Sequence, residues 1–263
     1  MAGIGHFFAW DGGCVLIGRH TARVPLHAHH ALQIVFGRDA RIRLRTAENE
    51  DWTEYPSAII PSRQPHSLDA TGASYAAVIL LEPETNEGRA LTELHLQRGI
   101  ASIDDPSVTR LMGALLEGWL AQPSARSVSQ AIRHIVQTLT RGVQPAVVTD
   151  PRIEKAIAYI NSHLDASLSL NEVAGEAYLS PSRFRHLFVE QTGMGLRPYI
   201  LWRRFLNVWE TLMAGESIST AAHRAGFADS AHLTRTSRRM FGLPPSAIQL
   251  LPDLRAREPG PRV

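Results

Sequence analysis

Two histidines separated by a single residue are the first side chains in this chain whose types and spacing could do chemistry. His27 and His29 lie in a predicted strand over 23–29, and alternate side chains of a strand point to the same face. Gln33 follows four residues later, and His66 comes further along the chain. Neutral imidazoles could bind a divalent transition metal, line a small-molecule pocket, or form hydrogen bonds in an otherwise apolar core.

A second kind of chemistry is predicted from a pattern that occurs twice in the last hundred residues. Each copy has a short apolar helix, a tight turn and an arginine-bearing helix, over 170–188 and 218–235. Small alanines let the two helices cross closely at the turn, so the polar face of the second helix points outward. This is the geometry of a helix-turn-helix, whose second helix enters the major groove of DNA. The pattern therefore predicts a DNA-binding function.

Short strands separated by turns are predicted across the first third of the chain. The segment 41–45 alternates arginine with isoleucine and leucine, as a strand with one wet face should. Many short strands at regular spacing favour a small antiparallel barrel or sandwich. The expected strands are 6–10, 14–20, 23–29, 32–36, 41–46, 57–60, 66–70 and 75–81.

Two amphipathic helices are predicted next, over 106–121 and 124–141, with Pro123 between them. Their apolar stripes consist of Val108, Leu111, Met112, Leu115, Leu116 and Trp119 in the first helix and Val128, Ile132, Ile135, Val136 and Leu139 in the second. This hairpin could cap the barrel, or its stripe could meet the same stripe of a second chain. The two roles do not exclude each other.

The fold class predicted from these patterns is α+β with two domains: an antiparallel β-barrel with a helical hairpin, followed by an all-α domain. The expected boundaries are 1–100 for the sensor barrel, 101–142 for the hairpin, 143–151 for a linker, 152–250 for two helix-turn-helix units and 251–263 for a disordered tail. A helix over about 197–214 should join the two units.

Composition narrows the class of protein further. The single cysteine, Cys14, excludes an internal disulfide framework and suits a reducing cytoplasm. No signal-peptide pattern opens the chain, and no apolar run approaches the roughly 20 residues that cross a bilayer. We therefore expect a cytoplasmic protein without a membrane partner. The formal net charge of +2 is too small to predict DNA binding, but the arginines cluster around the two helix-turn-helix patterns.

The region 152–250 resembles the DNA-binding domain of AraC/XylS-type transcription regulators. The residues that carry the resemblance are Leu179-Ser180-Pro181-Ser182, Leu187-Phe188, Gln191-Thr192-Gly193, Pro198-Tyr199-Ile200, Arg204, Ala225-Gly226-Phe227, His232-Leu233, Arg235, Arg238, Phe241-Gly242 and Pro244-Pro245. The resemblance implies seven helices, with two recognition helices entering adjacent segments of the major groove. One position departs from the pattern: Ser237 stands where an aromatic is usual, which removes a core anchor and could loosen the second unit. Ser237→Phe would test whether an aromatic raises stability.

Carried over position by position, the resemblance assigns residues that contact DNA. The base-facing set is Ser182, Arg185 and His186, with Arg183 nearby, in the first unit, and Ser230, Ala231, Thr234 and Arg235 in the second. Arginine can donate two hydrogen bonds to guanine, Ser and Thr adapt, and Ala can contact a thymine methyl group. The expected phosphate contacts are Arg203, Arg204, Arg238 and Arg239, although any one arginine could be a solvated surface charge. We expect the first unit to supply most of the specificity and the second mainly to fix register.

The N-terminal region resembles the cupin pattern, in which His-x-His, a glutamate and a later histidine converge on a divalent metal inside a barrel. His27, His29 and His66 would be the metal ligands, but Gln33 stands in place of the glutamate. Zn²⁺, Ni²⁺ or Cu²⁺ could still bind three imidazoles. Alternatively, the same four residues line a pocket for a small-molecule effector, or the histidines are structural. His30 should point to the opposite face.

These resemblances imply a sequence-specific transcription regulator, in a family where activation is more common than repression, and not an enzyme. The expected partners are double-stranded DNA, a small-molecule effector, RNA polymerase and a second copy of the chain. One alternative is a metal-dependent cupin enzyme or metal sensor fused to a DNA-binding domain, although the missing carboxylate disfavours the enzyme. Another is an architectural protein that binds DNA without sequence preference.

Overall fold

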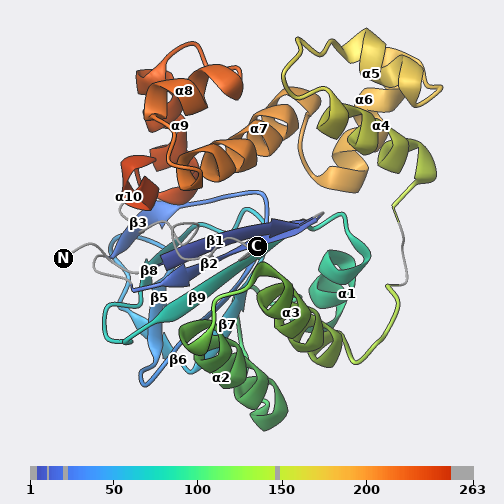
Figure 1. The fold of residues 1–263 in the computed structure, drawn as a ribbon. Coiled ribbons are helices and arrows are strands. Elements are labelled where there is room, and N and C mark those ends of the chain that lie inside the picture. Colours follow the sequence, from blue (N-terminus) through green and yellow to red (C-terminus); the bar gives the residue numbers. More distant parts are fainter. Residues whose placement is uncertain (1–4, 11, 20–22, 146–148, 250–263) are drawn as a thin grey trace, which may run out of the picture.

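The computed structural model describes residues 5–10, 12–19, 23–145 and 149–249, and has antiparallel strands in its N-terminal half and helices in its C-terminal half (Figure 1). The strands are β1 (Gly5–Trp10), β2 (Gly13–Gly18), β3 (Val24–His27), β4 (Leu32–Gly37), β5 (Ile42–Arg45), β6 (Thr53–Tyr55), β7 (Ser57–Ile60), β8 (His66–Asp69), β9 (Ala76–Leu81) and β10 (Ala101–Ser102). The helices are α1 (Asn86–His95), α2 (Pro106–Ala121), α3 (Ala125–Thr140), α4 (Pro151–Ser162), α5 (Leu170–Glu176), α6 (Pro181–Thr192), α7 (Leu196–Met213), α8 (Ile218–Arg224), α9 (Ser230–Phe241) and α10 (Ser246–Gln249).

The described strands form two antiparallel sheets. One has the order β1-β2-β9-β4-β7-β10 and the other the order β3-β8-β5-β6. Pairing of β3 with β8 places His27 directly opposite His66, with an irregularity in the register between Val24 and His27. The predicted α+β class with an antiparallel N-terminal region is confirmed. A closed barrel stays a prediction, because the ladders make two separate sheets.

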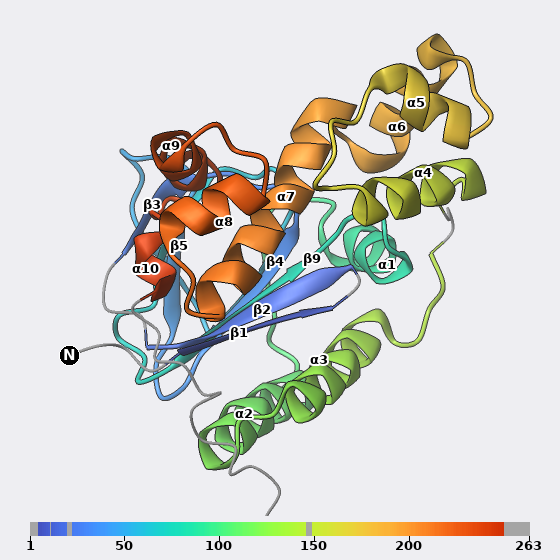
Figure 2. The same ribbon diagram turned by 45° about the horizontal axis from the view of Figure 1, so that its top comes forward.

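The larger sheet is buried on both faces, as alternate residues of its strands show. Val15 and Ile17 of β2 pack with α1, α2 and α3, whereas Cys14 on the opposite face shares a core with the C-terminal helices. Figure 2 shows this layering, with α2 and α3 on one side of the sheet and α7, α8 and α9 on the other. The sheet therefore joins the two halves of the chain through one apolar core.

The predicted helical hairpin is confirmed, with α2 and α3 at nearly the expected bounds. Asp105 caps α2 by accepting hydrogen bonds from the backbone N–H groups of Ser107 and Val108, and Ser124 caps α3. The predicted stripes are buried against the sheet, with Leu111 partly buried at their edge. Of the two roles left open, this packing supports capping, since the stripe is occupied within its own chain.

The C-terminal region contains seven helices within residues 149–249, as the resemblance implied. Two helix pairs, α5 with α6 and α8 with α9, lie at opposite ends of α7 (Figure 1). Ser169 and Glu172 form a capping box at α5, and Gly193 and Gly242 end α6 and α9 in the left-handed conformation. These local signals explain why the C-terminal helices were predictable.

Several elements differ from the sequence-based expectation. Helix α1 and the short strands β6 and β10 were not predicted, since α1 is mostly polar and the two strands have three and two residues. Strand β3 ends at His27, so His29 lies beyond the strand that was expected to carry both histidines. The predicted tail 251–263 and part of the predicted linker lie outside the described residues. Among the described helices, none is long and apolar enough to cross a membrane.

Candidate functional site

The first helix pair buries one side of α6 and exposes the other. Phe184 and Phe188, one turn apart, pack with Val173 and Ala174 of α5. The opposite side carries the residues predicted to face bases, and all of them are exposed: Ser182, Arg183, Arg185 and His186. Because Pro181 at the first helical position and the Ser180 side chain fix the start of α6, these polar groups form one outward-facing surface.

The second helix pair presents a comparable but less open face. Ala231, Arg235, Arg238 and Arg239 of α9 are exposed, whereas Ser230 and Thr234 are half-buried. The Thr234 hydroxyl donates a hydrogen bond of 2.8 Å to the Ser230 carbonyl of its own helix. Thr234 is therefore less available for other donors and acceptors than its position on the helix suggests.

Ser237 does not leave the gap that the sequence suggested. Its side chain is buried, and its hydroxyl donates a 2.5 Å hydrogen bond to the Leu243 carbonyl just after α9. Aromatic packing at this site comes from Phe241, whose ring lies 4.8 Å from that of Phe205 and 4.5 Å from that of Trp209. This packing predicts that an aromatic at 237 would lower the stability of this unit rather than raise it.

The two arginines of α7 that were predicted to contact phosphate are engaged inside the protein instead. Arg203 is largely buried and forms an ion pair with Glu82, next to the end of β9. Arg204 donates hydrogen bonds to the carbonyls of Leu164 (2.8 Å) and Ala166 (2.6 Å). The local sequence shows only arginines on an amphipathic helix, so their partners on other elements could not be anticipated.

Buried charged residues join β9 to α7. The Trp202 indole N–H donates to Glu82 at 3.4 Å, and His30 Nε2 lies 2.9 Å from a Glu84 carboxylate oxygen. Burial raises the pKa of Glu82 despite its pairing with Arg203. Burial acts in the same direction on Glu84, but the ion pair with His30 outweighs it and lowers the pKa of that carboxyl. As expected, His30 lies outside the group formed by the other histidines.

The first helix pair is attached to the sheet region by hydrogen bonds. Arg63 donates to the Gly193 carbonyl at 2.5 Å, and the Arg89 guanidinium donates to the Gln191 carbonyl at 3.0 Å. Gly193 ends α6 with a φ of 72°. The C-terminal end of α6 therefore lies against the N-terminal region, while the start of the helix, with Ser182 and Arg183, is exposed.

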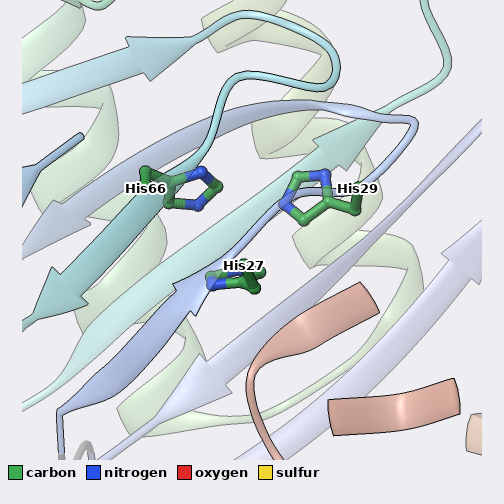
Figure 3. Close-up of side chains that lie close together, drawn as sticks. All are labelled: His27, His29 and His66. Carbon is green, nitrogen blue, oxygen red and sulfur yellow. The ribbon is translucent and has the colours of Figure 1, made fainter. Parts of the chain in front are cut away.

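The predicted histidine cluster is present, with all three side chains buried. His27, His29 and His66 each offer one ring nitrogen, and these nitrogens lie within 4.8 Å of one another. The ring centroids of His27 and His66 are 4.3 Å apart, and those of His29 and His66 are 5.4 Å apart. Figure 3 shows the three rings grouped around a common space. Strand β3, the short stretch that follows it and the distant strand β8 thus bring the imidazoles together.

Gln33 completes the cluster, as predicted, from the start of β4. Its Oε1 lies 2.9 Å from His29 Nε2 and 3.3 Å from His66 Nε2. Burial, together with the neighbouring imidazoles, lowers the pKa of His29 to about 4 and that of His66 to about 2. Burial also lowers the pKa of His27. The three imidazoles are therefore neutral at pH 7, which is the form that can bind a metal.

The second helix pair covers this cluster directly, a contact that the sequence did not reveal. The Phe241 ring stacks on His29 with centroids 6.0 Å apart, and the Trp202 ring lies 6.3 Å from His29. Gly242 lies so close to β3 that an added Cβ would come within 2.9 Å of the Pro25 carbonyl oxygen and 3.3 Å of His27 Nδ1. The histidine cluster and α9 therefore belong to one packed region.

Comparison with known proteins shows which family this chain belongs to. Residues 173–250 match a family model described as a helix-turn-helix domain. The regulatory protein PocR of Salmonella typhimurium is 29% identical over 172 residues, covering 64% of this chain and 54% of PocR. The multiple antibiotic resistance protein MarA of the same organism is 31% identical over 99 residues, covering 37% of this chain and 78% of MarA. The chain belongs to the AraC family of transcription regulators.

The family assignment is accompanied by a likeness in fold along most of the chain. The structure of ToxT from Vibrio cholerae O395 superposes with a TM-score of 0.59 at 13% identity, covering 90% of this chain and 96% of ToxT. At that identity the likeness shows the fold alone: an antiparallel N-terminal region followed by a helical domain. The chain spans about half the length of PocR.

Proposed function

We propose that this chain is a sequence-specific, DNA-binding transcription regulator, in which α5–α6 and α8–α9 are two helix-turn-helix units. The observation that carries the proposal is the outward-facing polar side of α6, with Arg185 and His186 exposed and Phe184 buried behind them. The match of residues 173–250 to a helix-turn-helix family supports it. In this proposal α6 and α9 are recognition helices that read base edges in the major groove.

The two units contribute unequally in this proposal. Arg185 and His186 of α6 are free to reach bases, whereas Thr234 of α9 hydrogen-bonds within its own helix. Arg235 is the base-reading candidate of the second unit, while Arg238 and Arg239 would contact phosphate and set register. The first unit would therefore supply most of the sequence preference.

The test is a comparison of selected and random DNA at one salt concentration, because phosphate contacts make affinity depend on salt. Full-length protein is used to select its preferred site from a random library. Arg185→Ala is expected to lose about 1–3 kcal/mol on the selected site and much less on random DNA. Arg126→Ala, which removes an exposed arginine from α3, is the matched control and should bind like the parent. Equal losses on both DNAs would contradict base reading by Arg185.

We propose further that an effector bound by the N-terminal domain controls this DNA binding. One ToxT structure is described as bound to an unsaturated fatty acid, which supports a small-molecule effector for a chain of this fold. The shared core of the larger sheet, α7 and α9 supplies a physical route. A ligand that binds better to one arrangement of this contact would favour that arrangement and so move α9.

The remaining partners belong to the same proposal. Activation through contact with RNA polymerase and action in the cytoplasm fit a regulator of this family. A homodimer would have to use a surface other than the apolar stripes of α2 and α3, since these pack on the sheet. The enzyme alternative has one observation in its favour, the three histidines. Among the described residues this group contains no carboxylate, so the regulator remains our proposal.

A further inference from the structure

We propose that His27, His29 and His66 form a transition-metal site. The second helix-turn-helix unit covers this site through Phe241 and Gly242, which we call its roof, so metal binding and DNA binding are linked. The site itself rests on the geometry of the cluster alone. The link to DNA rests on the proposed function above. Two measurements therefore separate the two statements.

The hydrogen bonds of the three rings place the proton on the same nitrogen of each ring. His27 Nδ1 lies 2.8 Å from the Pro25 carbonyl, His29 Nδ1 lies 3.0 Å from the Ala31 carbonyl, and His66 Nδ1 lies 2.9 Å from the Gln64 carbonyl. A carbonyl oxygen only accepts, so each Nδ1 must carry the proton. The Nε2 atoms are then unprotonated. Metal-binding histidines are commonly oriented in this way, with the second ring nitrogen donating to a carbonyl.

The separations between donor atoms suit a small metal ion. Nitrogen ligands about 2.0–2.1 Å from a tetrahedral metal lie roughly 3.3 Å from one another. Gln33 Oε1 already lies 2.9 Å from His29 Nε2 and 3.3 Å from His66 Nε2. The nitrogens that the three histidines can offer to a metal all lie within 4.8 Å of one another, so each ring would move inward by less than about 1 Å.

Gln33 indicates which metals suit the site and how the site would be arranged without metal. Three imidazole nitrogens and one amide oxygen suit Zn²⁺, Co²⁺, Ni²⁺ or Cu²⁺ and disfavour Ca²⁺ or Mg²⁺, which prefer oxygen ligands. As placed, Gln33 Oε1 faces two unprotonated nitrogens, and its Nε2 is buried without a hydrogen-bond partner among the described residues. A bound cation would accept electron pairs from Gln33 Oε1 and from both ring nitrogens, and so remove the repulsion between these atoms. Without metal, a flipped amide would donate to both rings instead.

The roof connects the site to the DNA-binding surface. Phe241, the last residue of α9, stacks on His29, and Gly242 lies over His27. Interiors are closely packed, so an inward shift of the rings changes the surface on which Phe241 rests. The residues of α9 predicted to face DNA begin at Ser230 on the same rigid helix. Metal occupancy is thereby coupled to the position of α9.

The first experiment measures metal binding by the full chain without an affinity tag. Isothermal titration with Zn²⁺ should give one equivalent at micromolar affinity or tighter, and Co²⁺ should give the intense visible bands of a low-symmetry nitrogen site. His66→Gln should lower affinity by at least about 100-fold, since loss of an outer partner alone costs 10- to 100-fold. His134→Ala, which removes an exposed histidine from α3, should bind like the parent. No binding by the parent, or equal binding by His66→Gln, would overturn the site.

A second variant protects this test against loss of folding. Gln33→Glu supplies a carboxylate where the structure has an amide, and should raise Zn²⁺ affinity by at least about 10-fold. A gain in affinity cannot come from an unfolded protein. Unchanged or weaker binding by a Gln33→Glu protein with the parent's circular dichroism spectrum would overturn the assignment of Gln33 to the site.

The second experiment measures the link with selected DNA in the presence and absence of Zn²⁺. We expect DNA affinity to change by at least about fivefold, and Zn²⁺ affinity to change by the same factor when DNA is added. His66→Gln should bind DNA but lose this response. Metal binding with unchanged DNA affinity would overturn the link. Selective DNA binding without any metal binding would overturn the site and leave the proposed regulator standing.

Discussion

Arg203 of α7 and Glu82, the residue after β9, form a buried ion pair across the contact between the sheet and the C-terminal helices. The Trp202 indole donates to the same carboxylate oxygen, so both groups lie on one turn of α7. A buried pair of this kind adds little net stability, because removing two charges from water offsets their attraction. We expect it instead to favour this register of α7, because a different register would separate the two buried charges.

Breaking this pair from one side should destabilise the whole chain. Arg203→Met leaves Glu82 buried without its partner and should cost about 3–5 kcal/mol in the free energy of unfolding. Arg197→Met, on an exposed side of the same helix, should change it by less than about 0.5 kcal/mol. Urea unfolding measures both. The double variant Glu82→Gln/Arg203→Met should recover part of the loss, and strictly additive losses would show that the two side chains do not interact.

The buried hydroxyl of Ser237 gives a prediction opposite to that from family comparison. Ser237→Phe inserts a ring into a filled core and removes the hydrogen bond to Leu243, which together should cost about 2–4 kcal/mol. Ser237→Ala removes only the hydrogen bond and should cost about 1 kcal/mol. Thermal and urea unfolding rank the variants. Greater stability of the phenylalanine variant would mean that the second unit holds an unfilled space.

Acid should weaken the fold partly through His6, which is not one of the clustered histidines. Burial lowers the pKa of His6 to about 4, and its Nδ1 accepts a hydrogen bond from Trp119, which requires the neutral ring. The unfolded chain binds a proton near pH 6.5, whereas the folded chain does so only near pH 4, so stability falls as pH decreases between these values. Between pH 7 and pH 5 this single group should cost about 1–2 kcal/mol.

The contribution of His6 is isolated by comparing pH profiles. His6→Gln cannot titrate, so its free energy of unfolding should fall less steeply from pH 7 to pH 5 than that of the parent. The other buried histidines titrate equally in both proteins and cancel in the difference. Parallel profiles would show that the His6 pKa is the same in the folded and unfolded chains.

Two glycines in matching positions test whether the second unit rests on β3. Gly193 and Gly242 both follow a recognition helix with φ near 70°, so an alanine at either pays about 1–2 kcal/mol for the left-handed conformation. At Gly193 the new methyl group would meet the mobile end of Arg63, whereas at Gly242 it would meet the Pro25 backbone. Gly242→Ala should therefore cost at least about 1 kcal/mol more than Gly193→Ala in urea unfolding. Equal costs would mean that α9 does not pack on β3 in solution.

Much of the fold follows from local sequence signals. Caps such as Asp105 and Ser124, and the apolar stripes between them, determine the bounds of α2 and α3 almost to the residue. Strand alternation located most of the strands. Helix α1 escaped because its few apolar residues, among them Ala90 and Leu91, make no recognisable stripe. Its burial depends on the sheet beneath it, which local sequence does not describe.

The sequence predicted which residues form the candidate site, but not which other elements pack against it. The spacing of His27 and His29 indicated a pair, and a family pattern added His66, which β-sheet pairing places opposite His27. Strand register and helix docking are tertiary properties, so the roof formed by Phe241 could not be read from either segment alone. For the same reason Arg203 looked like a surface charge. An amphipathic pattern indicates which side of a helix is buried, but it does not identify the residue of another element, here Glu82, that contacts that side.

The shared core of the sheet with α7 and α9 also determines how this protein can be divided. The linker that precedes α4 is an obvious place at which to begin a C-terminal fragment, because the chain after it contains every residue proposed to read DNA. A fragment made there would carry Trp202, Trp209 and Phe241 into water without the apolar surface that covers them in the intact chain. Because this core joins α7 and α9 to the sheet, we expect such a fragment to be less stable than the same residues in the intact chain.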